Sequence, residues 1–131
     1  MTQTSTAPNA GSKAMYWTGV GISSLVGLAM LGGGVAKVAM APNEQMMTDI
    51  GWATSKLPAL AILEIACAIL YIIPRTSVLG AILLTGYMGG AIATHVRVND
   101  LFVLQAAIGV LVWLGLYLRD ARLRQLIPLR A

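Results

Sequence analysis

Ionisable residues are scarce in this sequence, so those inside apolar runs are the ones that could do chemistry. Glu64 stands near the middle of an apolar run, eight residues past Lys56 or about 12 Å along a helix. If this run crosses a membrane, a carboxylate there costs on the order of 2.5–3.5 kcal/mol and must be paired, hydrogen-bonded or protonated. It could transfer a proton, bind a ligand or join helices, and the sequence leaves these roles open.

Four other residues could form a polar pocket with Glu64. His95 is the only histidine, and histidine exchanges protons near neutral pH, although a hydrogen-bonded residue at a helix end fits equally. Tyr87 lies two turns before it, at four-residue spacing on the same helix face. Lys37 and Arg97 end apolar runs, where basic residues are usually boundary anchors. We expect these five residues to converge toward the outer side of the membrane.

Several chemistries are not expected. Cys67 is the only cysteine, which excludes an intramolecular disulfide and two-cysteine thiol exchange. The sequence has no metal-ligand cluster and no phosphate-binding glycine loop, and one histidine cannot supply bis-histidine haem ligation. The net charge of +4 comes from basic residues at the ends of apolar runs, so we do not expect nucleic acid as a partner. Gln105 could join the pocket or bond a neighbouring backbone group, and we expect the latter. No cofactor can be assigned.

The elements that must position these residues are membrane-spanning helices. Of the sequence, 57% is hydrophobic and 11% is charged, against about 25% charged in soluble domains. Four apolar runs, at about 15–36, 57–73, 76–94 and 101–118, are long enough to cross a bilayer. Short turns at Pro74-Arg75 and Asn99-Asp100 make the later helices antiparallel neighbours, and Thr76 or Ser77 can cap the third. The fold class is therefore an all-α bundle of four transmembrane helices.

The remaining segments divide the chain further. Residues 1–13 are expected to be a disordered cytoplasmic N-terminus, 14–120 the transmembrane domain and 121–131 a basic cytoplasmic tail. In the connection 38–56, Asn43 can cap and Gly51 can close a short interfacial helix between the first two spans. Such a helix could cover the mouth of the bundle. A plain loop is the alternative.

Basic residues near the helix ends predict the orientation. The side of the two termini would hold six of them, and the other side three: Lys13, Arg75, Arg119, Arg122, Arg124 and Arg130 against Lys37, Lys56 and Arg97. This places both termini in the cytoplasm, for a multi-pass protein of the plasma (inner) membrane. Tyr71 and Tyr117 are expected in the inner interface and Trp52 in the outer one.

A glycine pair could bring helices close together. Gly86 and Gly90 have the GxxxG spacing of closely packed membrane helices. We expect the pair to pack within the bundle. A homo-oligomeric contact is the alternative.

Four stretches together resemble the DoxX-like family of small membrane proteins. They are GVAK at 34–37, LE at 63–64, IPR at 73–75 and GGAIATHVRVND at 89–100. The last is the most specific, because it is similar to the family's Gly-Ala-x-Ala-Thr-His-x-Arg stretch, which often continues with Gly-Asp. Asn99 stands here where glycine is common, and both residue types tolerate tight turns. The resemblance covers about residues 15–120.

The resemblance implies a four-helix bundle in the plasma membrane. Some relatives are subunits of a thiosulfate:quinone oxidoreductase, and others are linked to membrane oxidoreductase assemblies or amine-dehydrogenase maturation. No agreed set of catalytic residues can be transferred, so the chain is not assigned as an enzyme. The resemblance points to an accessory or redox-associated, quinone-linked subunit with a partner oxidoreductase. The alternatives are a non-enzymatic scaffold or assembly factor and, less favoured, a small-anion carrier.

Overall fold

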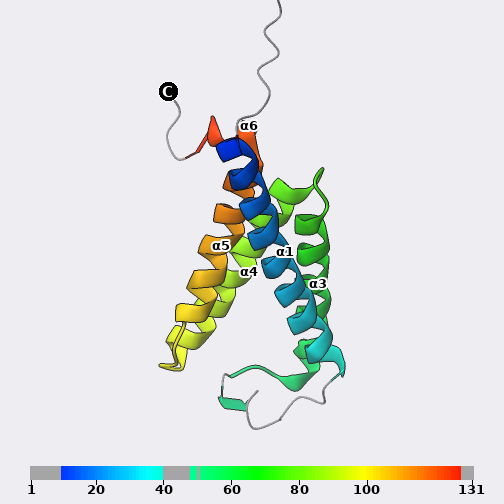
Figure 1. Ribbon diagram of the computed structural model, residues 1–131. Coiled ribbons are helices and arrows are strands. Elements are labelled where there is room, and N and C mark those ends of the chain that lie inside the picture. The colour runs from blue at the N-terminus through cyan, green and yellow to red at the C-terminus, as the bar shows by residue number, and fades with distance from the viewer. Residues whose placement is uncertain (1–9, 40–47, 50, 128–131) are drawn as a thin grey trace, which may run out of the picture.

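The chain folds as a bundle of helices (Figure 1). The computed structural model describes residues 10–39, 48–49 and 51–127, and every regular element in those ranges is helical. The elements are α1 (Ala10–Ala39), the 3-10 turn η1 (Thr54–Lys56), α3 (Leu57–Ile72), α4 (Ser77–Arg97), α5 (Val103–Arg119) and the short α6 (Ala121–Arg124). The all-α fold predicted from hydropathy is confirmed.

The long helices have the character of membrane spans. Ser12–Ala39, Thr54–Ile72 and Ser77–Arg97 are each long and apolar enough to cross a bilayer. α5 is also apolar, and its 17 residues rise about 25 Å, near the lower limit for a crossing helix. α1 begins at Ala10, ahead of the position near residue 15 that hydropathy indicates, and the other helices begin and end close to the expected residues.

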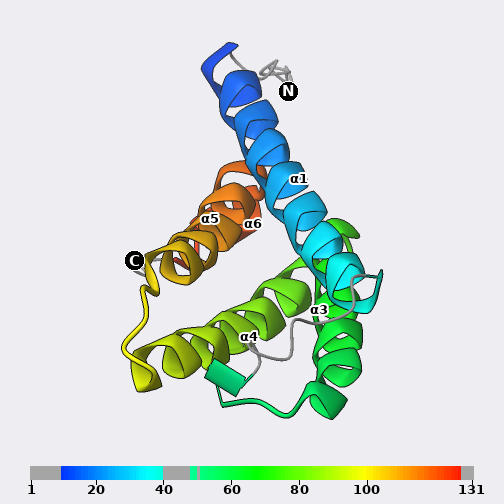
Figure 2. The ribbon, with the colours of Figure 1, turned by 90° about the horizontal axis from the view of Figure 1, so that it is seen from below.

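The four long helices form a ring in which sequence neighbours lie side by side. α3 packs on α1 and α4, and α5 packs on α4 and returns to α1 (Figure 2). α1 and α4 occupy opposite corners. Because the turns after α3 and α4 are short, each successive pair is antiparallel. This arrangement means that a group on α3 can contact both α1 and α4.

The turn between α3 and α4 follows from its proline. Ile73, the residue before Pro74, is extended (φ −70°, ψ 120°), because the proline ring disfavours helical geometry there. Thr76 and Ser77, which were predicted to cap the start of α4, instead bond carbonyl groups that precede it. Thr76 Oγ1 donates to the Leu70 carbonyl at 2.8 Å, and Ser77 Oγ donates to the Pro74 carbonyl at 3.1 Å. The hydroxyls therefore satisfy carbonyls at the end of α3 and leave the first amides of α4 without a side-chain cap.

The turn between α4 and α5 requires a left-handed residue. Asn99 has φ +57°, a conformation that glycine and asparagine tolerate better than other residues. Asp100 Oδ1 then accepts the Leu101 amide at 2.7 Å. This geometry suits an asparagine at this position, because its side chain tolerates a positive φ.

Tyr71 lies in the core, which corrects its predicted place in the inner interface. Its side chain is fully buried, and its hydroxyl donates to the Val112 carbonyl at 2.8 Å and pairs with the Ser23 hydroxyl at 3.1 Å. The Arg119 guanidinium donates to the Tyr71 carbonyl at 3.1 Å and stands 5.4 Å from the ring centre. These contacts join α3 to α1 and α5 at the end of the bundle near α6.

Glycines set the closest helix contacts, although not the pair expected to do so. A Cβ on Gly19 would lie 2.6 Å from the Arg119 amide nitrogen, and one on Gly80 would lie 2.2 Å from the Tyr71 nitrogen. Only glycine permits α1 to meet α5, and α4 to meet α3, this closely. Around Gly86 and Gly90, by contrast, no atom lies within 4 Å of an added Cβ in the described structure. Packing of this pair within the bundle is therefore not observed.

Most of the expected interfacial helix falls on residues 40–47 and 50, which lie outside the described residues. The part that is described agrees with a turn ending at Gly51. The Gly51 amide donates to the Thr48 carbonyl at 3.0 Å, and Gly51 has φ +74°. Such a left-handed glycine closes a helical turn without steric cost.

Candidate functional site

Glu64 is the most buried acidic residue in the described chain and has partners on two other helices. Its side chain on α3 is 3% exposed. Glu64 Oε2 forms an ion pair with Lys37 Nζ on α1 and accepts a hydrogen bond from the Tyr87 hydroxyl on α4 at 2.8 Å. We call Lys37, Glu64 and Tyr87 the carboxylate triad. It bridges α1 and α4, which do not pack on each other.

The inward face of α3 positions this carboxylate. Leu57, Ala61, Ala68 and Tyr71 are buried with Glu64 and recur at three- and four-residue intervals along the helix. Ala61 and Ala68, one turn on either side of Glu64, are fully buried and have short side chains. Their size brings the neighbouring helices close enough for an acid in the middle of the stripe to reach both of them.

A glycine on α1 makes room for the carboxylate. Glu64 Oε1 faces Gly33, and a Cβ added there would approach this oxygen to 2.9 Å. Lys37 follows one turn later on the same helix, and its side chain is 35% exposed. The triad is thus buried at its acidic end and reaches the surface at its basic end. The lysine stem spans the distance from the interior to the C-terminal end of α1.

His95 belongs to a second polar group. Its Nδ1 lies 2.8 Å from the Ala91 carbonyl, which can only accept, so Nδ1 carries a proton. Nε2 lies 3.1 Å from Gln105 Nε2 on α5 and 3.9 Å from Asp100 Oδ2. Both ring nitrogens are therefore engaged away from Glu64, so the structure does not bring His95 into the triad. Gln105 bonds this histidine rather than a backbone group, which corrects the prediction made for it.

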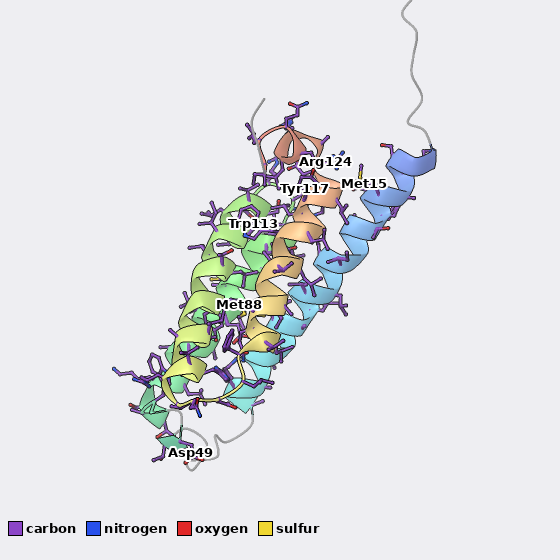
Figure 3. The ribbon with its side chains drawn as sticks, turned by 90° about the vertical axis from the view of Figure 1, so that its left-hand side faces the viewer. Met15, Asp49, Met88, Trp113, Tyr117 and Arg124 are labelled. Atoms are coloured by element: carbon purple, nitrogen blue, oxygen red, sulfur yellow. The ribbon has the colours of Figure 1, made fainter. Side chains whose placement is uncertain are left out.

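Arg97 lies at the C-terminal end of α4, beside Gly51 in the connection that precedes α3. A Cβ on Gly51 would come within 2.8 Å of Arg97 Nη2. Trp52 Nε1 donates to the Thr94 hydroxyl at 3.2 Å in the same region. Figure 3 shows Asp49 at this end and Met88 midway along the bundle. Of the five residues predicted to form the pocket, three are in contact, and His95 and Arg97 lie apart from them in the last turn of α4.

A known protein family matches most of this chain. The model of the DoxX-like family matches residues 21–116, a stretch that begins in α1 and ends in α5. The chain belongs to the DoxX-like family. The matched stretch includes all three residues of the carboxylate triad. No match was found among curated proteins or among solved structures. With its apolar helices, the chain is a DoxX-like membrane protein.

The triad of this DoxX-like protein combines two donors with one acceptor in an apolar setting. An ammonium and a phenol hydroxyl can donate, and a carboxylate accepts a hydrogen bond or a proton. Cys67, one turn beyond Glu64 on the same face of α3, is 2% exposed and adds no charge. Within the described residues, no three His, Cys, Asp or Glu side chains are grouped to hold a metal ion. The arrangement suits hydrogen bonding and proton exchange with a small polar group.

A second buried polar group, formed by Tyr71, Ser23 and Arg119, was not predicted from the sequence. Like the carboxylate triad, it joins three helices. Its signal was present, because Tyr71 follows Glu64 by two helical turns and so lies on the same face. The aromatic-belt rule favoured an interfacial place for a tyrosine near a helix end. Asking which polar residues of α3 share the helix face of Glu64 would have found it.

Proposed function

We propose that this DoxX-like protein is an accessory subunit of a quinone-linked redox system, and that the carboxylate triad is its quinone headgroup site. The observation that carries the proposal is the contact of buried Glu64 with two hydrogen-bond donors from different helices. A quinone headgroup has two carbonyl oxygens that need donors within an apolar cleft. The electrons would pass between the quinone and a partner oxidoreductase, and this chain would supply binding and proton exchange.

Each residue has a role in this proposal. Lys37 is the donor that can exchange, because its exposed stem allows the ammonium to leave Glu64 for a quinone oxygen. Tyr87 keeps its bond to the carboxylate and fixes its position. Glu64, relieved of its lysine, is the proton acceptor when a quinol is oxidised. His95, bonded to Gln105 and outside the triad, would exchange protons with water near the same end of the bundle.

The proposal is tested by binding. Purified protein in mild detergent is first extracted and analysed by mass spectrometry for bound quinone, and is then titrated calorimetrically with a short-chain ubiquinone analogue. Lys37→Met should weaken quinone binding by about tenfold or more, since a hydrogen bond to a charged group contributes about 1.5–3 kcal/mol. Glu64→Gln should weaken binding of the reduced quinol form to a similar extent, because the quinol hydroxyl donates to the carboxylate.

Lys56→Gln is the matched control. It removes a lysine from the same end of the bundle, at an exposed position of η1. Its affinity should equal that of the parent. Absence of quinone binding by the parent, or equal binding by all variants, would overturn the proposal. Unchanged quinone-linked oxidation in host membranes carrying Glu64→Gln would also count against it.

A non-enzymatic scaffold or assembly factor is the second candidate. It is favoured by the same contacts, because the triad joins α1, α3 and α4 and could serve only to hold them. In that case Glu64→Ala lowers the folded yield, the parent binds no quinone, and a stable partner subunit co-purifies. Native purification followed by mass spectrometry of co-purifying lipids and proteins separates the two candidates.

The setting in the cell is part of the proposal. We place the protein in the plasma membrane with both termini in the cytoplasm and the triad toward the outer leaflet, and the excess of basic residues on the side of the termini supports this orientation. The open face at Gly86 and Gly90 is available for a second copy of the chain. Accessibility labelling of single cysteines near each terminus, in a Cys67→Ala background, tests the orientation. Cross-linking of Gly86→Cys in membranes tests the dimer.

A further inference from the structure

A groove of about 550 Å³ lies at the end of the bundle opposite the triad. The turn joining α3 to α4 forms one side, and the residues that follow α5 form the other. Figure 1 shows α6 at this end, directly after the end of α5. The groove combines two cations with one acid and an apolar wall: Arg75, Arg122, Asp120, Val78, Leu123 and Leu126.

The arginines at this end differ in their partners. The guanidinium of Arg119 donates to the Tyr71 carbonyl, and that of Arg124 donates to the carbonyls of Tyr117 and Leu118 at 3.0 and 2.8 Å. Arg75 and Arg122 line the groove with exposed side chains, and no acceptor within residues 10–39, 48–49 and 51–127 is bonded to their guanidinium groups. Two full positive charges therefore remain to interact with a ligand.

The acid in the groove does not compensate both charges. Asp120 Oδ1 accepts the amides of Arg122 and Leu123 at 2.9 and 3.4 Å and so caps α6. One carboxylate against two guanidinium groups leaves the groove positive. Guanidinium groups bind phosphate through paired hydrogen bonds, so the complementary ligand is a phosphate oxyanion.

The apolar wall identifies the source of that phosphate. Val78 and Leu126 are 39% and 59% exposed beside the arginines, and Leu123 is buried between this groove and a second, apolar one of about 310 Å³. That second groove is lined by Trp113 and Tyr117, which Figure 3 shows on α5 below Arg124. A free phosphate ion gains nothing from contact with apolar side chains, whereas a phospholipid has an acyl chain that can pack against them. The ends of membrane-spanning helices also lie at the level of the headgroups.

We propose that this groove binds one anionic phospholipid, with the phosphate held by Arg75 and Arg122 and an acyl chain against Val78 and Leu126. Native mass spectrometry of the full chain tests this, using nanodiscs of phosphatidylglycerol, of phosphatidylcholine, and of an equal mixture. The parent should retain one phosphatidylglycerol in preference to phosphatidylcholine. The double variant Arg75→Gln, Arg122→Gln should lose about tenfold or more of that preference, since each arginine attracts anionic lipid independently.

The matched control removes two exposed lysines elsewhere, as Lys13→Gln with Lys56→Gln, and should keep the preference. Circular dichroism confirms the fold of each variant. Leu126→Asp provides an independent variant, because it adds an anion to the apolar wall and should also lower retention. Equal retention of both lipids by the parent overturns the proposal, as does full retention by the arginine double variant. Loss of the bound lipid in 10 mM inorganic phosphate would assign the groove to free phosphate and also overturn it.

Discussion

The Tyr87 hydroxyl on α4 donates to Glu64 Oε2 on α3 at 2.8 Å, at the oxygen that also pairs with Lys37 on α1. One carboxylate oxygen therefore joins three helices, two of which do not pack on each other. Because Glu64 is 3% exposed, these partners rather than water supply the hydrogen bonds to its carboxylate.

Removal of the buried carboxylate should destabilise the bundle. Glu64→Ala leaves an ammonium and a phenol without their acceptor, at a cost of about 3 kcal/mol. The measurement is thermal unfolding in detergent with a thiol-reactive fluorogenic dye, which reports exposure of Cys67, the only cysteine and buried. Leu63→Ala, a truncation at the adjacent and 50% exposed position, is the control and should change the melting temperature little. Equal effects of the two variants would contradict the account.

The hydroxyl of Tyr71 should contribute measurably at the other end. Tyr71→Phe removes the bonds to the Val112 carbonyl and the Ser23 hydroxyl, for a loss of about 1–2 kcal/mol in the free energy of unfolding. The same melting assay applies. Tyr16→Phe changes a tyrosine that is 48% exposed on α1, and should melt as the parent does.

Alanine substitutions at two glycines of α4 should differ in their effect on the free energy of unfolding. Gly80→Ala places a Cβ 2.2 Å from the Tyr71 nitrogen and 2.4 Å from its Cα, so α3 and α4 must separate, at a cost of about 1–3 kcal/mol. Gly86→Ala enters open space and should leave stability unchanged or raise it, because alanine favours helix. Melting in detergent at low protein concentration, which disfavours association of copies at this face, makes the comparison. A destabilising Gly86→Ala would show that this face is packed.

The turn at Asn99 should accept glycine and reject a branched side chain. With φ +57°, Asn99→Val costs about 1–2 kcal/mol, whereas Asn99→Gly is close to neutral. Asn99 is exposed, so lost packing does not confuse the comparison. Melting temperatures in the order glycine equal to asparagine, and both above valine, are expected. A valine variant as stable as the parent would mean that the turn relaxes to another conformation.

Hydropathy and turn residues were sufficient to predict the helices and their antiparallel order, because lipid leaves the backbone few alternatives. They also indicated that Glu64 must be paired and that Lys37 and Tyr87 were candidates. The partners of His95 could not be assigned, since they depend on how α4 and α5 are rotated about their axes. The roles of Gly86 and Tyr71 were misjudged for a related reason. Sequence spacing shows which residues share a helix face, but the packing of the helices determines what that face contacts.

The coupling between Lys37 and Glu64 decides whether the carboxylate triad holds the helices together. A double-mutant cycle with Lys37→Met, Glu64→Gln and the combined variant measures it through the free energies of unfolding in detergent. Because the pair is in contact and one partner is buried, the account predicts a coupling energy of at least about 1 kcal/mol, with the double variant less impaired than the sum of the singles. Additive effects of the two substitutions would contradict it.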